Sequence, residues 1–227
     1  HDGNPQAGSL QVGAAAIVAR ELGAPVVGDF RWGDLAMGGQ GAPISPFADW
    51  VLHRRVAPVL GILNLGGIAN LTLLRGEADP VASDCGPANG PLDAVVQQSS
   101  DAVFDEGGQL ALSGRVLPDL AAELRADPFF ARALPRSTGM ERVGPGLAQR
   151  IRAERPTARV EDLLATLVDW AGWGVAQTLA LAGAPGDCPV AVCGGGVENR
   201  ALMAAIERHL GKGRLRSYAS LALAGDL

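Results

Sequence analysis

The stretch Val59–Leu74, VLGILNLGGIANLTLL, decides the fold of this chain. Hydrophobic residues dominate its two arms, Val59–Leu63 and Ile68–Leu74, and the segment Asn64-Leu65-Gly66-Gly67 lies between them. Short apolar runs bounded by turn-forming residues are typical of buried strands, and glycines at the connection favour a hairpin. We therefore predict two antiparallel strands with Gly66 and Gly67 at the tip.

Strand and helix patterns alternate through the rest of the chain. We predict further strands at 24–28, 80–83, 189–192 and 215–218, and helices at 92–98, 116–125, 146–152, 161–182 and 199–210. Residues 29–46 contain too much glycine and proline for a regular element, so we predict a long binding loop there. Gly172 and Gly174 in the longest helix predict either a kink or close packing against a neighbour. This alternation of strands and helices places the chain in the α/β class.

The composition is that of a folded protein whose partners are small molecules. The 227 residues carry a formal net charge of −5 without a basic block, which argues against nucleic acids and anionic membranes as partners. No apolar run reaches the roughly 20 residues that cross a bilayer, and no leader-like segment opens the sequence, so we expect a cytoplasmic protein. The 3 cysteines form neither a disulfide framework nor a zinc-binding cluster. We expect no protein-bound metal and no catalytic histidine.

The segment Ser83-Asp84-Cys85-Gly86-Pro87-Ala88-Asn89 places a carboxylate at the end of a predicted strand. Such an acid projects into the crevice where α/β sheets bind ligands, and partial burial there would raise the pKa of Asp84 toward the range of a general base. The alternative is that Asp84 caps the turn leading to the next helix. The segment by itself leaves both interpretations open.

Two glycine turns could hold parts of a nucleotide. Asn64, Gly66 and Gly67 could form an anion-binding nest, or the glycines could be a plain hairpin tip. Gly194-Gly195-Gly196 follows a predicted buried strand and precedes a helix, so adenine or ribose could lie against its backbone and a phosphate near the helix start. Alternatively, it is a tight turn whose helix is capped by Asn199.

The predicted loop 29–46 has the groups to bind an acidic sugar. It contributes Asp29, Arg31, Asp34 and Gln40, which combine a planar guanidinium donor with acceptors for hydroxyls. An ion pair between Arg31 and Asp34 is the alternative. The chain lacks the P-loop, the Gly-x-Ser-x-Gly motif and the protein-kinase signatures, so any nucleotide chemistry must use another architecture.

Four stretches, taken in this order, resemble the anhydro-N-acetylmuramic acid kinase family of the sugar kinase and actin superfamily. They are 26–31 with 38–43, then 64–70, then 84–89, and finally 192–196 with Asn199. Shorter matches at 137–141 and 165–167 support them. Each stretch alone is weakly specific, but their joint occurrence across nearly the whole chain is highly specific.

The resemblance implies an actin- and hexokinase-like (ribonuclease H-like) fold of two lobes, each with a five-stranded sheet. It implies ATP and Mg²⁺ as cofactors, an anhydro-sugar as substrate, a possible homodimer, and Asp84 as the base that takes a proton from water. Asn64, Gly66, Gly67, Gly194, Gly195, Gly196 and Asn199 would contact the nucleotide. Asp29, Arg31, Gln40 and Asn89 would contact the sugar.

The resemblance also implies that family segments at both ends are missing from this sequence. The family begins with a Gly-Thr-Ser-x-Asp-Gly hairpin and ends with a helix, neither of which is present in these residues. We therefore expect residues 1–60 to be a remnant of an incomplete N-terminal lobe and 61–227 a C-terminal lobe without its final helix. Such a piece is expected to have little kinase activity. Two alternatives stay open, a non-catalytic sugar- or nucleotide-binding remnant and a kinase for another amino sugar.

Overall fold

The central hairpin forms as the sequence predicts. The structure is a computed structural model that describes residues 13–39, 41 and 43–221. Strand β1 (Leu60–Leu65) pairs antiparallel with β2 (Ile68–Leu74), with Leu60 opposite Leu74 and Leu65 opposite Ala69. Gly66 and Gly67 make the two-residue connection, so the prediction of a glycine-tipped hairpin is confirmed.

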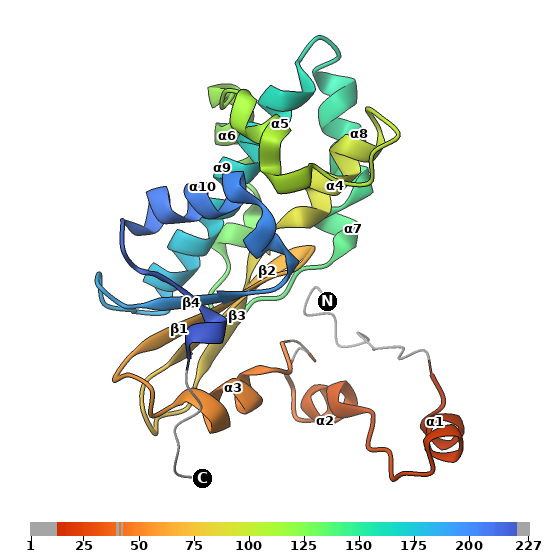
Figure 1. Cartoon of the computed structure of the whole chain (residues 1–227), viewed down its shortest axis with the longest axis vertical. Coiled ribbons are helices and arrows are strands. Elements are labelled where there is room, and N and C mark those ends of the chain that lie inside the picture. Colours follow the sequence, from red (N-terminus) through yellow and green to blue (C-terminus); the bar gives the residue numbers. More distant parts are fainter. Residues whose placement is uncertain (1–12, 40, 42, 222–227) are drawn as a thin grey trace. The chain divides into compact units, whose positions relative to one another are not determined.

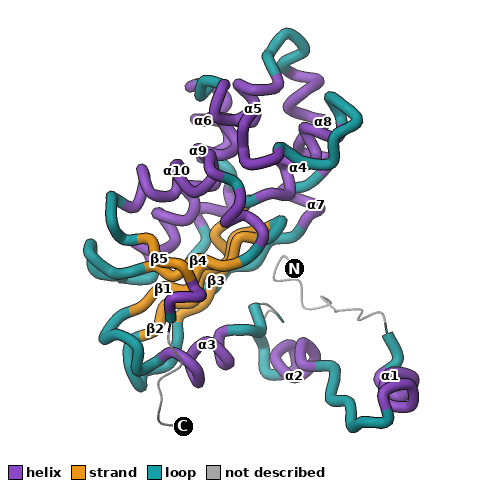
Figure 2. Tube along the Cα trace, viewed as in Figure 1, coloured by secondary structure: helices purple, strands orange, loops and turns teal. Residues whose placement is uncertain are grey.

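Three more strands complete a mixed sheet around this hairpin (Figures 1 and 2). They are β3 (Val81–Pro87), β4 (Val190–Cys193) and β5 (Leu215–Ser217), and the strand order is β3-β2-β1-β4-β5. The pairs β1–β2 and β2–β3 are antiparallel, whereas β1–β4 and β4–β5 are parallel. The α/β class and the five-stranded sheet are confirmed.

Strand β3 is longer than predicted and runs through Asp84 instead of ending before it. Asn70 lies opposite Asp84 and Ala69 opposite Gly86, so Cys85 is an extra residue that bulges from the ladder. A bulge lets pairing resume after a local bend, and Gly86 permits it because its φ of +111° suits glycine. The predicted end of this strand at residue 83 is therefore wrong, because pairing with β2 extends the strand to Pro87.

One face of the sheet is covered by two long helices, α9 (Val160–Leu181) and α10 (Arg200–Leu210). The two glycines of α9 allow the close packing that the sequence predicted. A Cβ atom at Gly172 would lie 2.8 Å from the backbone of Ala205 in α10, and one at Gly174 would lie 2.6 Å from the carbonyl oxygen of Cys85 in β3. Only glycine lets the helix approach both neighbours this closely.

The opposite face carries a smaller apolar cluster under helix α3 (Pro46–His53). Leu60, Ile62, Leu74 and Ala191 pack there against Trp50 of α3 and Tyr218 of the 3₁₀ helix η4 (Tyr218–Ser220). His53 is buried, and its Nε2 lies 2.8 Å from the Tyr218 hydroxyl. The side chains at the other end of the same face are polar.

A group of shorter helices surrounds the first half of α9 and forms the largest apolar cluster. They are α4 (Asn89–Gln97), η1 (Glu106–Gly108), α5 (Gln109–Ser113), α6 (Pro118–Arg125), η2 (Pro128–Ala131), α7 (Met140–Val143) and α8 (Pro145–Glu154). Pro118 and Pro145 stand in the first turns of α6 and α8, where the missing proline N–H costs nothing. Within the described ranges, no helix is long and apolar enough to cross a membrane.

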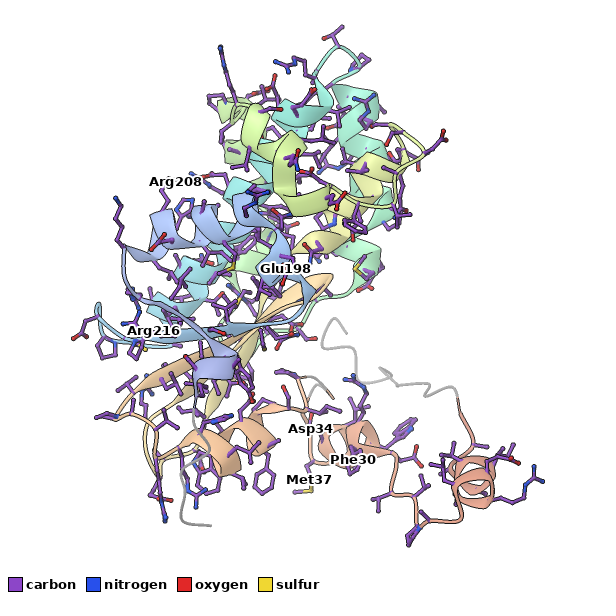
Figure 3. All side chains as sticks on the ribbon, in the orientation of Figure 1. Phe30, Asp34, Met37, Glu198, Arg208 and Arg216 are labelled. Carbon is purple, nitrogen blue, oxygen red and sulfur yellow. The ribbon has the colours of Figure 1, made fainter. Side chains whose placement is uncertain are left out.

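The chain divides into two compact units, one ending at Ile44 and the other beginning at Ser45. The first contains α1 (Ala15–Leu22) and α2 (Phe30–Ala36), and neither helix has a buried residue. Phe30 and Met37 are largely exposed at the two ends of α2 (Figure 3). All five strands of the sheet belong to the second unit.

Two predictions for the first unit are wrong. Residues 24–28 form no strand, because an apolar run becomes a strand only with a partner and the described part of this unit has none. Residues 29–46 are not one irregular loop, because α2 occupies Phe30–Ala36 and α3 begins at Pro46. The glycine pair Gly38-Gly39, which suggested a loop, follows the end of α2 and does not interrupt it.

Candidate active site

Four polar side chains form a row across the sheet at the end where β1 and β4 finish. The register places Cys193 opposite Asn64, Asn64 opposite Asn70, and Asn70 opposite Asp84. Residues directly opposite each other in neighbouring strands project to the same face of a sheet. The sequence therefore brings Asp84 and Asn64, which lie in separate motifs, to one polar strip.

Asp84 is held by donors from a distant loop. Its carboxylate oxygen Oδ2 accepts hydrogen bonds from the Ser137 hydroxyl at 3.1 Å and the Thr138 backbone N–H at 2.8 Å. The residue is only 6% exposed. Helix α4 has Ala88 at its N-cap and no side-chain cap, so the alternative of Asp84 as a helix cap is wrong.

The hairpin tip is fixed to the turn between β3 and α4. The Gly66 carbonyl accepts from the backbone N–H and the side-chain Nδ2 of Asn89, both at 3.0 Å. The Gly67 carbonyl accepts from the N–H groups of Ala88 at 3.1 Å and Gly90 at 2.9 Å. Asn89, predicted as a sugar contact, is the first residue of α4 and is hydrogen-bonded to the tip of the hairpin.

The second glycine turn packs against the end of β1. A Cβ atom at Gly194 would lie 2.6 Å from the Asn64 side-chain oxygen, and one at Gly196 would lie 2.6 Å from the Leu65 Cβ. Gly195 has no atom within 4 Å of such a Cβ, so its backbone faces open space. Gly194 and Gly196 are needed for packing, whereas Gly195 leaves room for a ligand.

Asn199 acts as the cap of α10, as one of the two sequence interpretations predicted. Its side-chain oxygen accepts a hydrogen bond from the Leu202 N–H at 3.0 Å. The 3₁₀ helix η3 (Gly195–Glu198) precedes it. The predicted nucleotide contact of Asn199 stays a prediction.

A small pocket of about 220 Å³ opens beside Gly195. It lies between α4, η1 and η3, and its lining is acidic and amide-rich: Asn89, Asp93, Phe104, Asp105, Gly107, Gly195, Glu198 and Asn199. Burial raises the pKa of Asp93 above its ordinary value. Asp105 accepts from the N–H groups of Leu110 and Ala111 and so also fixes the start of α5.

Five residues of this small pocket were missed by sequence reasoning, namely Asp93, Phe104, Asp105, Gly107 and Glu198. The sequence does contain a signal for Asp93. Asn89 and Asp93 are four residues apart on α4, so they share one face of the helix. Phe104 and Asp105 come from a connection whose position depends on the packing of the helical group.

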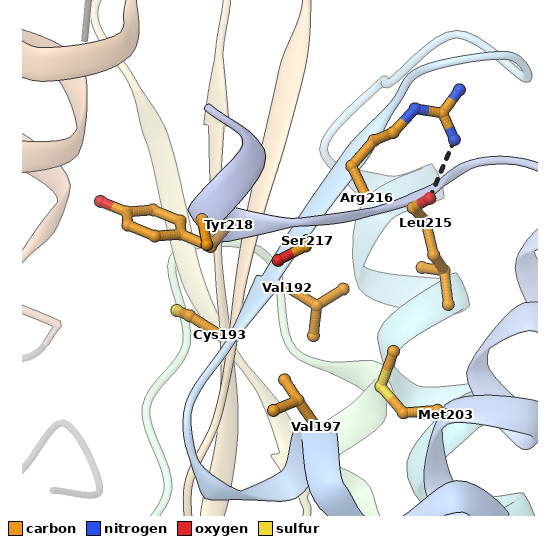
Figure 4. A pocket seen from close by; sticks show the side chains of 9 residues that line it. Val192, Cys193, Val197, Met203, Leu215, Arg216, Ser217 and Tyr218 are labelled. Carbon is orange, nitrogen blue, oxygen red and sulfur yellow. Dashed lines mark hydrogen bonds between the residues drawn. The ribbon is translucent and has the colours of Figure 1, made fainter. Parts of the chain in front are cut away.

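A second pocket of about 560 Å³ is lined by residues of β4, η3, α10, β5 and η4 (Figure 4). It is mostly apolar, with Val192, Cys193, Val197, Met203, Leu215, Arg216, Ser217, Tyr218 and Ala219 in its walls. Arg216 donates from Nη1 to the Leu215 carbonyl at 2.8 Å. Burial raises the pKa of the Cys193 thiol, which therefore favours its neutral form at this wall.

Of the predicted sugar contacts, Arg31 lies in the first unit's helix α2 and Asp29 directly precedes it. Gln40 is outside the described residues. Arg31 and Asp34 both bind the backbone of Gly41, so the described structure does not contain the ion pair that was the alternative. Asp29 precedes α2 with a φ of +60°. The role of these residues toward a sugar stays a prediction.

Comparison with known proteins gives a consistent family assignment. A family model described as anhydro-N-acetylmuramic acid kinase matches residues 1–227. An anhydro-N-acetylmuramic acid kinase of Streptomyces coelicolor is 40% identical over 221 residues, which cover 96% of this chain and 56% of that protein. The namesake of Pseudomonas putida is 37% identical over 218 residues, covering 96% and 60%. This chain thus spans little more than half the length of these relatives.

Among solved structures, an activator of the 2-hydroxyisocaproyl-CoA dehydratase from Clostridium difficile with bound ADPNP is similar with a TM-score of 0.45 and 15% identity. The match covers 73% of this chain and 55% of that one. The assignment itself comes from the sequence matches, which extend over the whole chain and include all four motif stretches. By these matches, the chain belongs to the anhydro-N-acetylmuramic acid kinase family.

Proposed function

We propose that this chain serves as an ATP-dependent kinase that opens 1,6-anhydro-N-acetylmuramic acid with water and phosphorylates its O6. The products are N-acetylmuramic acid 6-phosphate and ADP, a step in the recycling of cell-wall sugars. The observation that carries the proposal is the polar row ending in Asp84, which lies at the same end of the sheet as both glycine turns. Ligands of α/β sheets bind outside the carboxyl ends of such strands.

Asp84 is the general base of the proposed reaction. It takes a proton from water, whose oxygen then bonds to the anomeric carbon while the bond from that carbon to O6 breaks. The freed O6 bonds to the γ-phosphorus of ATP as ADP leaves, and the proton passes to solvent. The two donors on Oδ2 keep the carboxylate in one orientation, which is what a base needs to meet a positioned water molecule.

The nucleoside end of ATP fits the small pocket better than the phosphates do. Asp93, Asp105 and Glu198 line it and would repel a polyanion, whereas carboxylates accept hydrogen bonds from ribose hydroxyls. Its volume of about 220 Å³ is below the roughly 300–1,000 Å³ of sites that enclose a whole ligand, so it suits only a part such as ribose. The phosphates would then extend past Asn89 toward the hairpin tip.

Mg²⁺ would come with the phosphates. The described residues contain no group of three or more His, Cys, Asp or Glu side chains that could hold a metal ion. Mg²⁺ commonly binds through substrate phosphates and water with only one or two carboxylates, so this side-chain set fits a nucleotide-borne ion. When bound, the ion would neutralise the negative charge that develops on the phosphates.

A coupled assay tests the proposal. The chain is incubated with ATP, Mg²⁺ and 1,6-anhydro-N-acetylmuramic acid, and the phosphosugar is measured at a protein concentration high enough to detect slow turnover. We expect product from the unchanged chain and a loss of about 10²- to 10⁴-fold in Asp84→Asn, the usual contribution of a general base. Asp101→Asn, which alters an exposed carboxylate outside the row, is the matched control and should keep its activity.

Two outcomes would contradict the proposal. Equal turnover by Asp84→Asn and the unchanged chain would show that another group is the base. Binding of ADP and sugar in calorimetry, with no phosphosugar formed, would show a binding protein and not a kinase.

A further inference from the structure

The loop that contacts Asp84 is anchored by a buried arginine. Arg136 is 1% exposed, and its guanidinium donates to the Phe130 carbonyl at 2.9 Å, to Gln177 Oε1 at 3.0 Å and to Thr178 Oγ1 at 2.9 Å. The guanidinium carbon also lies 4.6 Å from the centre of the Phe129 ring. Burying a charge is costly unless its hydrogen bonds are met, and here neutral acceptors take both terminal nitrogens, whereas Nε is buried without a partner among the described residues.

The backbone of the same arginine is fastened to the edge of the sheet. The Arg136 N–H donates to Ser83 Oγ at 3.0 Å, and the Arg136 carbonyl accepts from the Asp84 N–H at 3.0 Å. Both ends of one residue are therefore fixed on β3, directly beside the candidate base. This leaves little freedom to the next two residues of the loop.

Those next two residues supply the donors on Asp84. Ser137 is 4% exposed, and its hydroxyl and the Thr138 N–H share the single oxygen Oδ2. Two donors on one oxygen hold that oxygen in place and so limit how the carboxylate can turn. A serine that only filled space or stabilised a turn would not need to direct its hydroxyl at this oxygen.

We propose that Ser137 is a positioning residue for the base, with Arg136 as the anchor that holds it in place. The Ser137 hydroxyl and the Thr138 amide orient the Asp84 carboxylate toward the water that attacks the sugar. The proposal rests on the proposed function for its catalytic consequence, but the orientation of Asp84 can be measured without turnover.

The test compares Ser137→Ala, Ser137→Thr and a matched control, Thr166→Val. Thr166 is also buried, and its hydroxyl accepts from the Leu117 N–H and donates to the Asp162 carbonyl, with no contact to Asp84. Each variant is measured for thermal unfolding, for the carbon-13 carboxyl signal of Asp84 in the ligand-free chain, and for kcat and KM. The Asp84 signal is identified by its disappearance in Asp84→Asn.

We expect Ser137→Ala to move the Asp84 signal and to lower kcat by about tenfold to a hundredfold, the cost of one hydrogen bond to a charged group, with little change in KM. Ser137→Thr keeps the hydroxyl, so its Asp84 signal and its kcat should match those of the unchanged chain. Thr166→Val should lower the unfolding temperature while the Asp84 signal and kcat stay unchanged.

An unmoved Asp84 signal in Ser137→Ala would overturn the proposal, even if that variant is less stable. So would equal losses of kcat in Ser137→Ala and Thr166→Val, because these would reflect stability alone. A chain that forms no phosphosugar at all contradicts the proposed function, and the Asp84 signal then still decides whether Ser137 orients the carboxylate.

Discussion

At the residue scale, neighbouring positions in β3 have opposite environments. Asp84 belongs to the polar row, whereas Cys85 is packed among the apolar side chains under α9 and α10. Burial raises the pKa of the Cys85 thiol to about 12. Because only the thiolate is nucleophilic, this cysteine is inert at physiological pH although it lies next to the candidate base.

This difference predicts the order of thiol modification. In the native chain at a mildly alkaline pH, iodoacetamide should modify the half-buried Cys193 first and leave Cys85 unmodified until the protein is unfolded. Peptide mass spectrometry after timed labelling gives the order. Native labelling of Cys85 as fast as that of Cys193 would show that the Cys85 environment is open, contrary to the structure.

At the element scale, α9 holds the sheet and the helical group together through its glycines. A Cβ atom at Gly174 would meet the Cys85 carbonyl at 2.6 Å and the Phe130 ring at 3.2 Å, and neither a backbone atom nor a packed ring moves aside cheaply. The Cys85 carbonyl also belongs to the bulge that follows Asp84. A change at Gly174 therefore disturbs both the packing of α9 and the strand that carries the base.

We expect Gly174→Ala to lower the free energy of unfolding by about 1–3 kcal/mol, the usual cost of overpacking. Gly146→Ala in α8 is the control, since a Cβ there meets nothing within 4 Å. That control should gain about 0.5–1 kcal/mol from helix propensity. Urea denaturation measures both, and a neutral Gly174→Ala would contradict the close packing.

Elements with local signals were predictable, and those that depend on partners were not. The hairpin strands were found because their apolar arms and glycine tip are contiguous in the sequence. The run at 24–28 is also apolar but has no neighbouring strand in the described part of its unit, and β3 extends past its apolar part because β2 pairs with it. The candidate site also depends on tertiary packing, because the hydrogen bond from Ser137 to Asp84 joins residues that are 53 positions apart in the sequence.

At the scale of the whole molecule, the two units differ in how they are stabilised. The unit from Ser45 onward has apolar clusters on both faces of its sheet and around α9. In the first unit, α1 and α2 have no buried residue, and isolated helices of 8 and 7 residues gain little stability in water. Local unfolding of the first unit should therefore cost much less free energy than unfolding of the second.

Hydrogen exchange tests this difference directly. Amides of α1 and α2 should exchange within the earliest time points, whereas those of β1, β2 and α9 should exchange only through global unfolding. Limited proteolysis should likewise cut first between residues 13 and 44. Equal protection of α2 and α9 would show that the first unit is stabilised by contacts beyond those described within it.

In the proposed reaction, Asp84 activates a water molecule that opens the anhydro ring as the phosphate is transferred. Running the reaction in oxygen-18 water, followed by mass spectrometry of both products, tests this most directly. We expect one oxygen-18 atom at the anomeric hydroxyl of the phosphosugar and none in the transferred phosphate. An unlabelled sugar, or label in the phosphate, would contradict it.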